Sequence, residues 1–105
     1  MFLSDTLNAI YEESGKFDLD TCNKIILTIG DRAREDIGSY ADVAKQKNGI
    51  NSKVLLSCLD NIDNVFKRFT KEHDDIPSAL VRVVNENMQG YRQLIYDAVQ
   101  RTHKQ

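Results

Sequence analysis

The side chains that could do acid–base or metal chemistry are few in this chain of 105 residues, which has two histidines and two cysteines. A di-metal carboxylate site in a helical bundle uses Glu-x-x-His units. Thr70 and Gln100 stand three residues before His73 and His103, so neither histidine belongs to such a unit. We therefore expect a protein that is not an enzyme and that holds no metal and no cofactor.

The two cysteines, Cys22 and Cys58, lack the paired spacing of a zinc site. If the helices that carry them pair antiparallel about residues 47–51, the two residues are on the order of 25 Å apart, too far for a disulfide. Free thiols are typical of a reducing compartment. No apolar run of about 18 residues could span a membrane, and the first residues lack a secretory signal. These features predict a cytoplasmic protein with no membrane contact.

One carboxylate is out of place for a simple amphipathic helix. Asp36 falls near the middle of the apolar sector of the second expected helix, where the inward positions are reduced to Gly30 and Ala33. Glycine inside a helix costs about 1 kcal/mol relative to alanine. One interpretation is that small residues let two helices approach closely, or that the helix kinks there. The other is a polar recess at Gly30, lined by Asp36 with Arg32 or Arg34 at its edge, in a ligand-binding bundle.

The charge pattern gives little support to nucleic-acid binding. The formal net charge is -2, from 14 basic and 16 acidic residues, and the two signs alternate along the chain. Lys67, Arg68 and Lys71 come nearest to a basic patch, but cations in the last turns of a helix also interact favourably with its dipole. A nucleic-acid-associated regulator, in which a dimer joins two such clusters, is therefore an alternative that we do not favour.

The elements that position these residues follow from the spacing of apolar side chains. Steps of three and four residues put side chains on one side of an α-helix, and four segments of the chain follow these steps. Apolar residues make up 41% of the chain, which fits one globular domain over residues 1–105. The four stripes are Leu3, Leu7, Ile10 and Tyr11; Leu19, Cys22, Ile26, Ile29, Ala33, Ile37, Tyr40 and Ala44; Leu55, Cys58, Leu59, Ile62, Phe66 and Phe69; and Leu80, Val84, Tyr91, Leu94, Ile95, Ala98 and Val99.

Capping and breaking residues set the ends of these helices. The turns between the three long helices are about five residues or fewer, which favours antiparallel packing of neighbours. We predict an all-α fold, a small antiparallel bundle of three long helices with a short N-terminal helix across one end or one groove. The expected bounds are Ser4 or Asp5 to Gly15, the Phe17–Asp20 capping signal to Gln46, Asn51 or Ser52 to His73, and Pro77 in the first turn of a helix that ends near Thr102.

The third and fourth helices carry apolar arcs of about 140° and 160°, wider than one helix–helix seam needs. Other helices of the bundle could cover the surplus, and so could a second protein. Asn87 falls at the centre of the arc of the last helix, whereas Leu56 and Tyr96 fall off their stripes. A buried asparagine often fixes register or partner choice between helices, although a satisfied core asparagine or a local rotation of the helix would explain it equally.

The leading hypothesis is a non-enzymatic protein–protein interaction module, such as a small regulator, adaptor, immunity or chaperone-like protein. It could also form a homodimer. The expected partner-binding residues are Leu56, Asn87, Tyr91 and Tyr96, on the third and fourth helices. Fold analogy adds nothing, because small helical bundles serve many unrelated functions.

Overall fold

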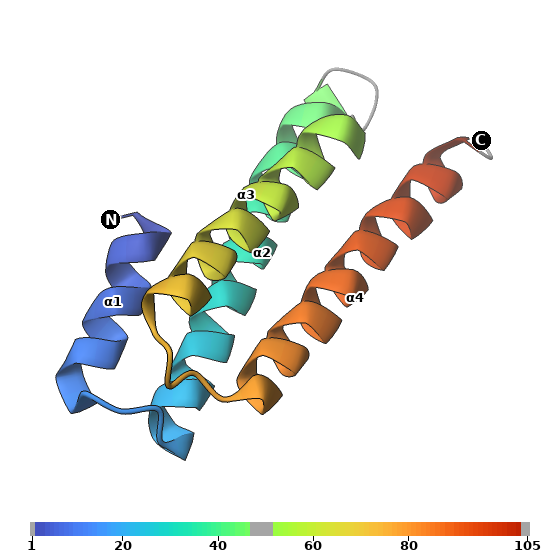
Figure 1. Ribbon diagram of the computed structural model, residues 1–105. Coiled ribbons are helices and arrows are strands. Elements are labelled where there is room, and N and C mark those ends of the chain that lie inside the picture. Colours follow the sequence, from blue (N-terminus) through green and yellow to red (C-terminus); the bar gives the residue numbers. More distant parts are fainter. Residues whose placement is uncertain (1, 47–51, 104–105) are drawn as a thin grey trace.

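The computed structural model consists of four α-helices joined by short turns (Figure 1). It describes the backbone of residues 2–46 and 52–103 and the side chains of residues 2–39 and 52–100. No strand occurs in these described residues, so the predicted all-α fold is confirmed. The helices are α1 (Leu3–Ser14), α2 (Leu19–Gln46), α3 (Ser52–Glu72) and α4 (Ser78–His103).

The three long helices form the framework of the bundle. Figure 1 shows α2 and α3 running in opposite directions, and α4 runs antiparallel to α3 and packs against both α2 and α3. The short helix α1 packs on α2 and α3, and within the described residues it does not contact α4. The predicted antiparallel packing is therefore confirmed, and α1 occupies the groove between α2 and α3. As a result, α3 touches all three other helices, whereas α4 touches two.

The core is built from all four helices and is almost entirely aliphatic and aromatic. Thr21 is its one described buried polar side chain, and its hydroxyl lies 2.8 Å from Oγ of Ser14. Ile25 and Met88 are fully buried although they were absent from the expected stripes, while Leu19 and Leu94 were expected inside and are exposed. The buried apolar residues are Leu3, Leu7, Ile25, Ile29, Ala33, Leu55, Leu59, Ile62, Phe66, Phe69, Leu80, Val84, Met88 and Ile95.

Local sequence explains the turn between α1 and α2. Gly15 adopts φ +70°, a left-handed conformation that glycine accepts without strain, and its N–H donates to the carbonyl of Tyr11 at 2.7 Å. The carboxylate of Asp18 accepts a hydrogen bond from the N–H of Thr21 at 2.8 Å and so caps α2. Both signals were predicted. The start of α1 was not, because the helix begins at Leu3 after Phe2, without a side-chain cap.

The Asp18 cap gives the fold an acid-sensitive contact. The Thr21 N–H and hydroxyl, with Lys16 and Lys24 nearby, lower the pKa of Asp18 below its ordinary 3.8. A lowered folded-state pKa stabilises the fold above the ordinary value, and this contribution is lost as the pH falls through the folded value. Asp18→Asn keeps an acceptor but cannot titrate, so its melting-temperature deficit relative to the unaltered chain should shrink between neutral pH and pH below 3.8. Asp20→Asn removes the same charge two residues away and serves as the control; a deficit for Asp18→Asn that does not change with pH would contradict the prediction.

The turn between α3 and α4 is covered by an aromatic cluster. The ring of His73 lies 4.4 Å from that of Tyr11 and 4.5 Å from that of Phe69, measured between centroids, and Phe17 joins them from the α1–α2 turn. Nε2 of His73 is 3.4 Å from Oδ1 of Asn8. These contacts attach α1 to the end of α3. Pro77 precedes α4 instead of lying in its first turn as predicted, and its carbonyl accepts the first helical hydrogen bonds.

Candidate functional site

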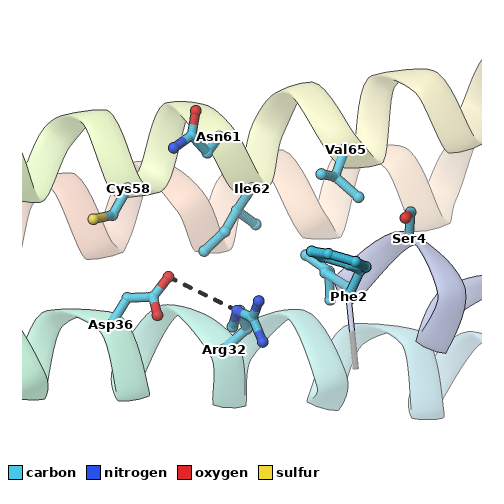
Figure 2. A pocket seen from close by; sticks show the side chains of 9 residues that line it. Phe2, Ser4, Arg32, Asp36, Cys58, Asn61, Ile62 and Val65 are labelled. Atoms are coloured by element: carbon cyan, nitrogen blue, oxygen red, sulfur yellow. Dashed lines mark ion pairs between the residues drawn. The ribbon is translucent and has the colours of Figure 1, made fainter.

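Arg32 and Asp36, the two residues of the predicted polar recess, line a pocket of about 360 Å³ (Figure 2). They lie one turn apart on α2, and Nε of Arg32 is 3.9 Å from Oδ2 of Asp36. Cys58 and Ile62 of α3 face them across the pocket, and Phe2 lies between the two helices at one end. The other residues of its wall are Leu3, Ser4, Asn61 and Val65. Arg32 and Asp36 thus line one pocket, and neither Gly30 nor Arg34 belongs to its wall.

Gly30 faces the other side of α2, where α4 packs. A Cβ atom at Gly30 would lie 2.9 Å from the hydroxyl of Tyr91, closer than side chains normally approach. Arg34 of α2 donates a hydrogen bond to the same hydroxyl at 3.2 Å. The absence of a side chain at Gly30 thus makes room for the side chain of Tyr91 in the contact between α2 and α4.

A pair of glycine substitutions tests this contact. Gly38 has no heavy atom near the place of its missing Cβ, so Gly38→Ala should raise the free energy of unfolding by about 0.5–1 kcal/mol through helix propensity alone. Gly30→Ala should gain less or destabilise, because Tyr91 must move. In a Tyr91→Phe background the gain should approach that of Gly38→Ala. Denaturant unfolding measures all three, and equal gains for Gly30→Ala and Gly38→Ala in the unaltered chain would contradict the contact.

The four predicted partner-binding residues do not form one surface. Tyr91 is half-buried against the core and faces Gly30, and Asn87, one turn earlier, is on the same side of α4. Leu56 and Tyr96 lie toward the seam between α3 and α4. Leu56 precedes Asp60 by four residues and Tyr96 follows Arg92 by four residues, so in these antiparallel helices both lie one turn from the Asp60–Arg92 ion pair, in the same direction. Asn87 is exposed, not central to the apolar arc as expected, since Met88 takes the inward position.

Two further apolar side chains border the seam between α2 and α4. Leu94 follows Tyr91 by three residues and is 57% exposed, and Leu27 precedes Gly30 by three residues and is 62% exposed. The α2–α4 face, as we call it, consists of Leu27, Asp31, Arg34, Asn87, Tyr91 and Leu94. Sequence reasoning missed Leu27, because a single leucine off the stripe is ordinary on protein surfaces.

The basic residues Lys67, Arg68 and Lys71 are exposed in the last turns of α3. Arg68 lines a small pocket together with Glu72, and Asp74 and Asp75 follow in the turn. The acidic neighbours reduce the positive potential that a polyanion would meet.

No group of three or more His, Cys, Asp and Glu that could hold a metal ion occurs in residues 2–39 and 52–100. Burial and the charge of Asp18 raise the pKa of Cys22, which disfavours the reactive thiolate. Neither Cys22 nor Cys58 forms a disulfide, as expected. No described helix combines the length and apolar character needed to cross a bilayer.

Comparison with known proteins gives no indication of function, so the function of this chain is inferred from the surfaces described here. Neither a protein-family model nor a curated protein nor a solved structure matches the chain.

Proposed function

We propose that this protein is a protein–protein interaction module and that its binding surface is the α2–α4 face. The observation that supports the proposal is the unequal coverage of the two wide apolar arcs. Three helices cover α3, so its arc needs no partner, whereas α4 contacts only α2 and α3 and leaves Leu94 exposed beside Tyr91. Leu27 extends the apolar surface across the seam.

The charges of the face favour a second copy of this chain as the partner. Asp31 and Arg34 are both exposed, and they form an ion pair with each other on the surface of α2. A two-fold axis through the face can set Asp31 of one copy near Arg34 of the other, so the same patch serves both subunits. A strongly charged partner would gain little from a surface with one acid and one base.

Measurement of the solution mass over a range of protein concentrations tests the proposal. We expect a dimer whose dissociation constant rises about tenfold or more in Leu94→Glu and Leu27→Glu, since each puts a charge in the centre of an apolar contact. Leu19→Glu alters an exposed leucine outside the face and is the matched control. A monomer at every concentration, or a dimer that is indifferent to both substitutions, would contradict the second copy as partner.

A further inference from the structure

The pocket between α2 and α3 lies on the opposite side of α2 from the α2–α4 face and has different chemistry. It brings a positive and a negative side chain together beside an apolar wall (Figure 2). From this combination we propose that the pocket binds a free α-amino acid with an apolar side chain. The proposal is independent of the dimer, because the two surfaces share no residue.

The charges of the pocket are available to a ligand. At 3.9 Å the contact between Arg32 and Asp36 is long for an ion pair, and both side chains are partly exposed. Within the described residues, neither side chain makes a hydrogen bond or ion pair other than this one. A guanidinium has five N–H donors and a carboxylate can accept about four hydrogen bonds, so most of this capacity is left for a bound molecule.

A zwitterion matches both charges at once. Its carboxylate can accept two parallel hydrogen bonds from Arg32, the geometry that guanidinium groups favour. Its ammonium group, carried on the same carbon atom, then lies close enough to meet Asp36, which is adjacent to Arg32. A phosphate would be repelled by Asp36, and a carboxylic acid without an amine would bring no positive charge to meet the carboxylate of Asp36.

The walls and the size of the pocket indicate the side chain. Ile62 and Val65 of α3, with the ring of Phe2 at one end, offer apolar surface next to the charged pair. Ligand pockets commonly measure about 300–1,000 Å³. At about 360 Å³ this one is near the lower limit, which favours one amino acid over a nucleotide or a larger cofactor. Leucine and phenylalanine are therefore the first ligands to test.

Titration of the full chain with L-leucine and L-phenylalanine, followed by amide chemical shifts in NMR, tests the inference. We expect saturable shifts centred on residues around the pocket. Glycine lacks the side chain, 3-phenylpropionate lacks the ammonium group and phenethylamine lacks the carboxylate, so each should bind about tenfold more weakly or worse. If 3-phenylpropionate or phenethylamine bound as tightly as L-phenylalanine, or if neither amino acid gave a saturable shift at millimolar concentration, the proposal would be overturned.

Charge-removing variants locate the site. Arg32→Gln and Asp36→Asn should each weaken amino-acid binding about tenfold or more, while thermal unfolding shows that both still fold, since partly exposed ion pairs contribute little stability. Arg34→Gln and Asp31→Asn make the same changes on the other side of α2 and should bind the amino acids as the unaltered chain does. Binding that survives Arg32→Gln and Asp36→Asn would place the ligand elsewhere and reject this pocket.

Discussion

Replacing Leu59 by alanine should lower the free energy of unfolding by about 2–5 kcal/mol. Leu59 is completely buried in α3, which contacts each of the other three helices. Truncation removes its apolar contacts and leaves a cavity that rigid neighbours fill only in part. Domains of this kind are stable by about 5–15 kcal/mol in total, so the loss is a large share of the whole.

The measurement is denaturant unfolding of the variant and of a matched control. Leu19→Ala removes the same atoms from an exposed position at the start of α2 and should change the free energy of unfolding by about 0.5 kcal/mol or less. A similar cost for both substitutions would mean that Leu59 is not in a packed core. The packing of the other helices around α3 would then be contradicted.

Apolar spacing predicted the helices well because it is a local property of each segment. A stripe at helical spacing must be buried somewhere, and the capping residues Asp18 and Gly15 act within one turn of themselves. The number of helices, their order and most of their ends therefore follow from the sequence. Two helix starts differ from the prediction: α1 begins at Leu3 without a side-chain cap, and α4 begins after Pro77.

The rotation of α4 about its axis could not be read from the spacing. Two contacts with other helices fix it: Tyr91 packs against Gly30 on one side, and Arg92 pairs with Asp60 and Asp63 on the other. Met88 precedes Tyr91 by three residues and Arg92 by four, so it lies between these two contacts and points into the core. Asn87 is turned outward as a consequence.

The sequence alone also predicts part of each candidate site. Arg32 and Asp36 are four residues apart on one helix, so their proximity is predictable. Phe2 and Cys58 join them only through the packing of three helices, and no local pattern indicates that meeting. The same holds for Leu27 and Leu94, which become neighbours of one seam through the contact between Gly30 and Tyr91.

The ion pairs between α3 and α4 should produce the second large effect. Arg92 is 20% exposed and donates hydrogen bonds to Asp63, which is 19% exposed, and to Asp60 at 3.0 Å. Arg92→Met keeps much of the apolar stem but leaves Asp63 largely out of water without its cation. Because breaking a buried pair costs about 3–5 kcal/mol and breaking an exposed one costs less than about 1 kcal/mol, a loss of about 1–3 kcal/mol is expected for this intermediate burial.

A double-mutant cycle separates the pair from the side chains themselves. Arg92→Met, Asp63→Ala and the double variant, compared by denaturant unfolding, should give a coupling energy of about 0.5–3 kcal/mol. Asp31 and Arg34 form a more exposed pair on α2, and the equivalent cycle there should give about 0.2–1 kcal/mol that falls further with added salt. If the two coupling energies were equal and equally sensitive to salt, Arg92 would be an ordinary surface charge, and the position of α4 would depend on its apolar contacts alone.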